Sequence, residues 1–213
     1  MLNTIISFIL LPFLIQGQPI IAGNVEPLAS REFSLENRYT SEFVNDVFKD
    51  NILLTLKYLA QEKIDPKKIN FEKVRKPFDY RIVLKPRETF AFHDDVLPEF
   101  EGKIAKTTNA HFNGEEGFRS SGFLVGDGVC HLASLLYWVA RDAKLEAVSK
   151  VNHNFANIPQ VPNEYGVSIY AFPGKQTTDQ MQNLYITNNR DQEIAFEFIY
   201  DGQNLKITVV ESI

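Results

Sequence analysis

Residues 194–210, IAFEFIYDGQNLKITVV, give the clearest indication of the fold. Segments 194–200 and 205–210 are rich in β-branched and aromatic residues, which favour strands. The Asp201-Gly202 step between them is typical of a hairpin turn, so we expect an antiparallel pair. Similar runs at 167–172 and 184–187 predict two more strands.

Two helices are predicted before these strands. Apolar residues recur at helical spacing over 41–61, with Ser41 as a cap and Pro66 beyond the end. A second apolar stripe runs over 130–143, after a region rich in Gly, Asn, Ser and Thr. A short strand is expected at 81–84. Helices followed by sequential strands indicate an α+β fold: an N-terminal helix, a central helix that carries the cysteine, and an antiparallel C-terminal β-sheet.

Composition excludes several classes of protein. The 213 residues are 44% apolar, so the chain can bury a core and is not disordered throughout. A formal net charge of −5 argues against nucleic acid as a partner. Cys130 is the single cysteine, which rules out an intrachain disulfide and a Cys-rich zinc site. No P-loop, G-x-G-x-x-G or G-x-S-x-G motif occurs, so we expect no cofactor.

The N-terminus indicates export. Residues 4–15 form an apolar run that is shorter than the roughly 20 residues needed to span a bilayer. Its length suits a secretory signal, although no Lys or Arg precedes it and a clear cleavage motif is missing. A buried N-terminal strand or helix is the alternative. We expect residues 1–22 to be a signal peptide, 23–40 an arm, and the protein to be extracytoplasmic, with membrane contact only through the apolar segment.

Residues 61–88 carry nine Lys or Arg against five Asp or Glu, a net charge of +4. This charge is typical of a solvated connector. The alternative is a docking patch for an anionic polymer.

The candidate for chemistry is Cys130. It follows Gly126 and Gly128, which permit close approach of backbone or substrate. At the first turn of a helix, unpaired N–H groups and the helix dipole favour the thiolate, so the thiol pKa is expected to fall. His153, 23 residues later, is the candidate base, and the N–H groups of Val129 and Cys130 are candidate oxyanion donors.

Other interpretations of these residues stay open. A lone helical cysteine is often a packing residue, and the neighbouring Asp127 would raise the thiol pKa. His131 points off the face of the thiol by about 100° of helical turn. Four residues are candidates to orient the imidazole of His153: Asn154, Asn157, Glu164 and Asp179. His93 with Asp94 and Asp95 is the best metal cluster, but no ligand spacing supports it, so no metal site is predicted.

The stretch 126–137, GDGVCHLASLLY, resembles the G-G-G-V-C-Q-x-[SA]-[ST]-x-L-Y core of VanW-like proteins. Residues 86–92 (PRETFAF) resemble the family's P-G-E-T-F-S-F element, and His153-Asn154 its H-S step. Residues 170–174 and 184–189 are similar to two further family segments. Residues 61–80 look like an insertion into a VanW-like domain at 41–213.

This chain departs from the family pattern at several positions. Gln176 stands where the family has Asp, Asp127 replaces the middle Gly, His131 the Gln, and Arg87 a Gly. If the Asp completes a catalytic set, Gln176 orients His153 without supplying charge.

The resemblance implies a bacterial envelope protein, often exported, and supplies no reaction. We expect it to bind or modify peptidoglycan or another cell-wall polymer or peptide. The first alternative is a thiol-dependent amide hydrolase or acyltransferase that uses Cys130, His153 and Gln176. The second is a purely structural or protein-interaction domain. The residues expected at the substrate are Gly126, Asp127, Gly128, His131 and Ser134. The oligomeric state stays open.

Overall fold

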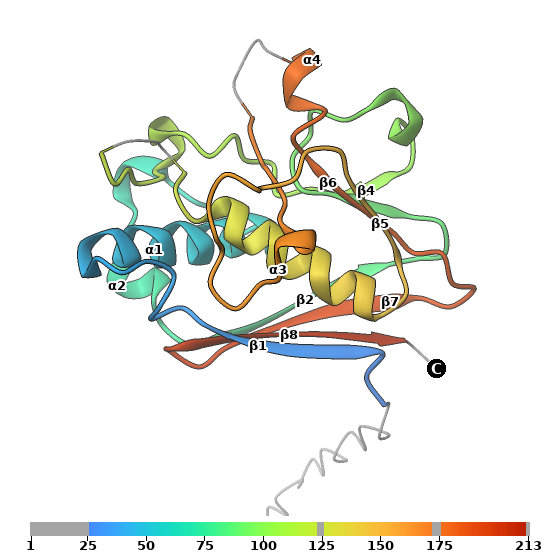
Figure 1. Cartoon of the computed structure of the whole chain (residues 1–213), viewed down its shortest axis with the longest axis horizontal. Coiled ribbons are helices and arrows are strands. Elements are labelled where there is room, and N and C mark those ends of the chain that lie inside the picture. The colour runs from blue at the N-terminus through green and yellow to red at the C-terminus, as the bar shows by residue number, and fades with distance from the viewer. Residues whose placement is uncertain (1–25, 123–125, 172–175, 212–213) are drawn as a thin grey trace, which may run out of the picture.

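The structure is a computed structural model that describes residues 26–122, 126–171 and 176–211 (Figure 1). It is an α+β fold with two four-stranded sheets, which confirms the predicted fold class. The prediction for residues 1–22 lies outside the described residues. Among the helices of the described ranges, none has the length and apolar character needed to cross a bilayer.

The first sheet is antiparallel throughout and has the order β1-β8-β7-β2. The predicted hairpin at its centre is confirmed, and Asp201 Oδ1 accepts the N–H groups of Gln203 (2.8 Å) and Asn204 (2.7 Å) at the turn. The strands are β1 (Ala29–Ser34), β2 (Phe78–Leu84), β7 (Ile194–Tyr200) and β8 (Asn204–Glu211).

The second sheet has the order β4-β3-β6-β5. The β3–β4 pair is parallel, and β3–β6 and β5–β6 are antiparallel. Its strands are β3 (Thr89–Ala91), β4 (Ile104–Lys106), β5 (Glu146–Ser149) and β6 (Leu184–Thr187).

Helix α3 (Val129–Asp142) carries Cys130 and contacts strands of both sheets as well as helix α1 (Glu42–Leu59). Its buried residues include Leu132, Leu135 and Val139, so the predicted apolar stripe is the face that joins the two sheets into one core. Short helical segments complete the fold: α2 (Phe71–Val74), α4 (Gln176–Asp179) and 3₁₀ turns at Pro66–Lys68, Pro98–Phe100, Gly114–Glu116 and Asn163–Tyr165.

Three local predictions are corrected. The expected arm contains strand β1, whose Phe33 is buried and which pairs with β8 along its whole length. The expected strand over 167–172 is not one within residues 167–171, because its backbone hydrogen bonds go to side chains and loops instead of a ladder: Val167 to Ser134, Ser168 to Val151, Ile169 to Cys130. Ser41 precedes α1 as predicted, but its side chain makes no capping hydrogen bond.

Candidate functional site

Five aromatic or imidazole rings form a continuous row between helices α1 and α3 and the loop that follows β5. Consecutive centroids are 5.6 Å apart for Tyr39–Phe48, 5.0 Å for Phe48–His131, 6.3 Å for His131–His153 and 4.0 Å for His153–Phe155. We call these five residues the ring row. Its middle is buried at His131 and His153, and its ends are open, with Tyr39 51% and Phe155 71% exposed.

Asn45 of α1 fixes the end of the row that carries Tyr39. Its Oδ1 accepts the backbone N–H groups of Arg38 (2.6 Å) and Tyr39 (3.1 Å), and its Nδ2 donates to the carbonyl of Leu35 (3.1 Å). Asn45 is buried, so these bonds are protected from water. The loop before α1 is thereby held against the helix in one conformation.

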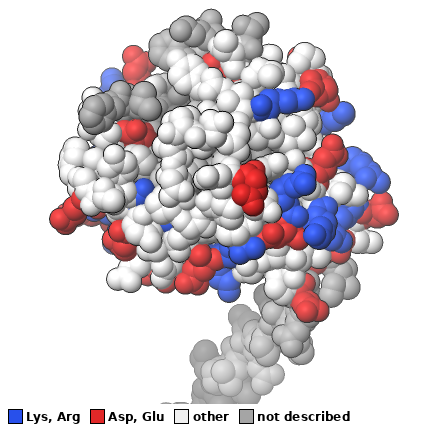
Figure 2. Space-filling view, viewed as in Figure 1, with Lys and Arg blue, Asp and Glu red and all other residues white. Residues whose placement is uncertain are grey.

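The face of the molecule over α3 is largely uncharged. In Figure 1 the loop that carries the Asn163–Tyr165 turn crosses in front of α3, and in Figure 2 the middle and left of the same view are mostly white. Lys, Arg, Asp and Glu gather toward the right and the lower edge.

Cys130 lies at the start of α3 under the segment that leads to Tyr170. The backbone N–H of Ile169 points to its Sγ at 3.4 Å, and Sγ lies 3.7 Å from the carbonyl oxygen of the same residue. Burial raises the pKa of the Cys130 thiol to about 11, and the charge of Asp127 adds to the rise. The expectation of a lowered thiol pKa is therefore wrong, because loss of hydration outweighs the effect of the helix terminus.

Within the described residues no hydrogen bond joins Cys130 to His153. The Nδ1 of His153 lies 3.1 Å from the carbonyl oxygen of Ala156, and its ring contacts Phe155 and His131. The structure thus places His153 in the ring row beside His131, rather than in a hydrogen-bonded pair with the thiol. The assignment of nucleophile and base stays a prediction.

Alkylation of Cys130 by iodoacetamide is expected to be about 100-fold slower in the folded protein than in urea at pH 8, since only the thiolate reacts. The ratio follows from a folded pKa of about 11 against an ordinary value near 9. Mass spectrometry of timed samples gives both rates. A native rate equal to that of the unfolded chain would contradict the raised pKa of this half-buried thiol.

The glycines before Cys130 serve backbone packing. Both have positive φ, +82° for Gly126 and +95° for Gly128. A Cβ on Gly128 would lie 2.6 Å from the carbonyl oxygen of Phe48, and one on Gly126 would lie 2.8 Å from that of Phe112. The Gly-x-Gly step therefore brings α3 against α1, which places Phe48 at ring-contact distance from His131.

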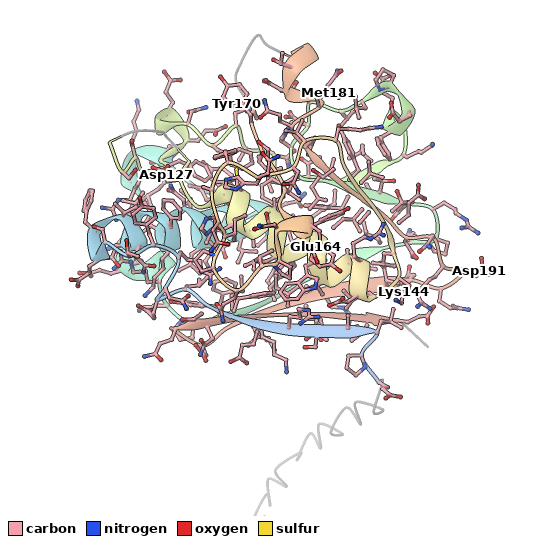
Figure 3. All side chains as sticks on the ribbon, in the orientation of Figure 1. Asp127, Lys144, Glu164, Tyr170, Met181 and Asp191 are labelled. Carbon is pink, nitrogen blue, oxygen red and sulfur yellow. The ribbon has the colours of Figure 1, made fainter. Side chains whose placement is uncertain are left out.

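Asp127 and its neighbours form the loop that leads into α3. Asp127 Oδ2 accepts the N–H of Ser121 at 2.8 Å, and its carbonyl accepts Asn51 Nδ2 at 2.8 Å. Asn51 also accepts the N–H of Arg119, and the fully buried Asp50 pairs with the guanidinium groups of Arg119 and Arg75. Figure 3 shows Asp127 at the side of the molecule where α1 and α3 meet. These contacts give Asp127 a structural role in the loop.

Burial keeps the imidazoles of the ring row neutral. The pKa of His131 falls to about 3 through burial and then through the charge of Arg38 and the neighbouring His153. Burial also lowers the pKa of His153. A neutral imidazole of this kind donates or accepts hydrogen bonds and adds no charge to the site.

The free energy of unfolding is expected to fall as pH drops from about 6.5 toward 3, because the unfolded chain takes up a proton that buried His131 refuses. In the pH range where the unfolded chain binds one proton more than the folded protein, the free energy of unfolding falls by about 1.4 kcal/mol per pH unit. Urea denaturation of wild type and His131→Phe between pH 7 and 4 measures this slope. We expect the variant to have the shallower slope; equal slopes would show that His131 titrates normally.

Of the other predicted site residues, Ser134 contacts the backbone of Cys130, and no hydrogen bond joins the rest to Cys130 or His153 within the described residues. Ser134 is fully buried, and its hydroxyl donates to the carbonyl of Cys130 and accepts the N–H of Val167. Asp179 is buried and acts on the pKa of His93 rather than on His153. The side chain of Gln176 lies outside the described residues. Asn154, Asn157 and Glu164 are exposed.

The metal candidate considered from the sequence does come together. Ligand atoms of His93, Asp94 and Asp95 lie within 4.8 Å of one another. Both ring nitrogens of His93 are already engaged, Nε2 with the carbonyl of Gln182 at 3.0 Å and Nδ1 with Asn183 Nδ2 at 3.3 Å. His93 thus has no free lone pair for a metal in this arrangement.

The basic segment lines a hollow of about 340 Å³ between α1 and α2. Four lysines line this hollow, and two of them are paired with acids that also line it. Lys57 pairs with Glu62, and Lys68 pairs with Asp65. This pairing fits the solvated connector better than a docking patch for an anionic polymer.

A family model described as VanW like protein matches residues 67–210, about two thirds of the chain. The chain belongs to the VanW-like family. The match begins within the basic segment and includes α3, the loop with His153 and both C-terminal strands, while Tyr39 and Phe48 precede it. Comparison with curated proteins and with solved structures gives no match.

Three features of this VanW-like protein carry no sequence signal. Nothing in the polar stretch 35–40 marks Arg38 as buried, and Phe48 and Phe155 look like ordinary apolar residues of a helix and a loop. The ring row is assembled from four separate segments, so only the fold reveals it. The sequence pattern predicted a site at the first turn of α3, centred on the thiol of Cys130. The ring row instead includes His131, the next residue on that turn.

Proposed function

We propose that this VanW-like protein is an exported binding module that holds peptidoglycan fragments on the ring row. The observation that carries the proposal is the row itself, with Tyr39 and Phe155 exposed at its ends. The apolar faces of sugar rings stack on exposed aromatic rings. Export rests on the apolar N-terminal run predicted to be a signal peptide.

Binding is favoured over thiol chemistry by the state of Cys130. A nucleophile needs a thiolate and a base within hydrogen-bond reach. Here the thiol pKa is raised, its Sγ faces the backbone of Ile169, and His153 is engaged by Phe155 and His131. The surrounding rings offer contact area instead of reacting groups.

Phe155→Ala is expected to weaken binding to purified peptidoglycan by about tenfold or more, as loss of an exposed aromatic anchor does at other interfaces. Its side chain is 71% exposed, so folding should be nearly unchanged. Co-sedimentation with the insoluble polymer, over a range of polymer concentration, gives the affinity. Ile199→Ala is the matched control, since Ile199 is 46% exposed on β7 outside the ring row.

Equal affinity of wild type and Phe155→Ala would place the binding surface elsewhere. Absence of binding by the wild type would refute the proposed function itself.

A further inference from the structure

A buried arginine without a counter-ion lies beside the ring row. The side chain of Arg38 is 1% exposed, and its Nη2 donates to two neutral amide oxygens, Asn37 Oδ1 at 3.0 Å and Gln160 Oε1 at 2.6 Å. Its Nε and Nη1 have no hydrogen-bond partner. Among the residues that the structure describes, no carboxylate lies within ion-pair distance of Arg38.

This guanidinium keeps its charge. Burial lowers the pKa of Arg38 only to about 10, so it is protonated at neutral pH. A buried charge without an opposite charge is strongly unfavourable, and such groups in proteins are normally paired or bind an ion. The unmet N–H groups therefore indicate an anion that completes the site.

His131 supplies a second unmet group, and it is linked to Tyr39, the residue after Arg38, by ring contacts through Phe48. It is 5% exposed, its Nδ1 has no hydrogen-bond partner, and the charge of Arg38 is near enough to depress the pKa of its ring. With Nδ1 protonated, the neutral imidazole donates one hydrogen bond. Arg38 and His131 together thus offer donors and a single positive charge.

Two exposed amide side chains contact the guanidinium of Arg38. Asn37 and Gln160, whose oxygens accept from Arg38, are both exposed, and the next residue, Tyr39, is half exposed at the end of the ring row. Gln160 Oε1 also accepts the N–H of Ser34 at 3.1 Å, so a ligand that reaches the guanidinium must take the place of these amide oxygens. A ligand that stacks on Tyr39 can therefore place an acidic group on Arg38.

We propose that Arg38 and His131 bind a carboxylate of the ligand that lies on the ring row. The inference rests on the proposed function and names the chemistry by which the ligand is anchored. A single positive charge matches a carboxylate better than a phosphate dianion, and Arg is well suited to carboxylate recognition.

The test compares soluble peptidoglycan fragments with free carboxylates and the same fragments after amidation, by calorimetry with wild-type protein. We expect the free carboxylates to bind at least tenfold more tightly. The net charge of −5 would by itself favour the amidated fragments, so this preference requires a specific site. Arg38→Met is expected to bind both forms equally. Arg87→Met, which removes an exposed arginine paired only at the surface, should keep the preference.

The outcomes separate the two proposals. Equal, measurable affinity of the wild type for both fragments overturns the carboxylate site and leaves the binding function standing. No binding of either fragment overturns both. The wild-type melting temperature gives a test that needs no variant: acetate should raise it relative to acetamide at equal ionic strength. Stabilisation by inorganic phosphate alone would overturn the choice of a carboxylate.

Discussion

Asp50→Ala is expected to lower the free energy of unfolding by about 3 kcal/mol, because it breaks a buried ion-pair network. The carboxylate of Asp50 is fully buried and pairs with Arg75, through Nε at 2.5 Å and Nη2 at 3.1 Å, and with Arg119. Removal leaves Arg119 without this counter-charge and leaves Arg75 with only its exposed partner Asp46. Both are about one-third exposed, which places the cost at the lower end of the range for buried pairs.

Asp46→Ala is the matched control, because Asp46 also pairs with Arg75, at 3.2 Å, but its side chain is 41% exposed. An exposed pair of this kind contributes at most about 1 kcal/mol. Urea denaturation of the two variants beside the wild type measures both effects. Equal destabilisation by the two substitutions would contradict the structural role assigned to Asp50.

Gly128→Ala is expected to destabilise the protein by about 3 kcal/mol, through backbone strain and overlap together. Gly128 has φ +95°, and a Cβ there would lie 2.6 Å from the carbonyl oxygen and 2.8 Å from the Cα of Phe48. Both atoms belong to the α1 backbone, so the overlap is relieved only by moving α1 away from α3. We therefore also expect weaker wall binding, because Phe48 and His131 separate.

Gly122→Ala isolates the contribution of strain. Gly122 has φ +104°, and apart from its chain neighbours no atom of the described residues lies within 4 Å of the position its Cβ would take. We expect a loss of about 1 kcal/mol from the left-handed backbone alone, with wall binding unchanged. If Gly128→Ala costs no more than Gly122→Ala, the close packing of α1 on α3 is not as the structure describes it.

Much of the fold follows from local pattern. Alternating β-branched and aromatic residues predicted β6 and β7 at their observed bounds, and the Asp201-Gly202 turn predicted the pairing of β7 with β8. Strand β1 (ASREFS) was not predicted, because four of its six residues are polar or charged and it is defined by pairing with a strand that is distant in sequence. The composition of residues 167–171 is typical of a strand. In the structure their N–H groups donate to side chains of α3 instead of a neighbouring strand, Val167 to Ser134 and Ile169 to Cys130.

The site was less accessible from the sequence. The Gly-x-Gly-Val-Cys step predicts the start of α3, but the loss of hydration around the thiol cannot be read from spacing, and it reverses the expected pKa shift. The sequence predicts that Gly126 and Gly128 permit close approach of backbone or substrate. In the structure the backbone of Phe112 approaches Gly126, and that of Phe48 approaches Gly128. Arg38 lies 93 positions before His131, and only the packing of the β1–α1 loop against α3 brings them together.

The central claim is that the ring row binds the wall polymer and that Cys130 does not act on it. The most direct test is the binding isotherm of wild type, Cys130→Ala and Phe155→Ala on purified peptidoglycan, with release of soluble fragments followed in the same samples. We predict wild-type affinity for Cys130→Ala, an affinity lower by about tenfold for Phe155→Ala, and no fragment release by any of the three. Fragment release by the wild type that disappears in Cys130→Ala would contradict the account and establish a thiol-dependent enzyme instead.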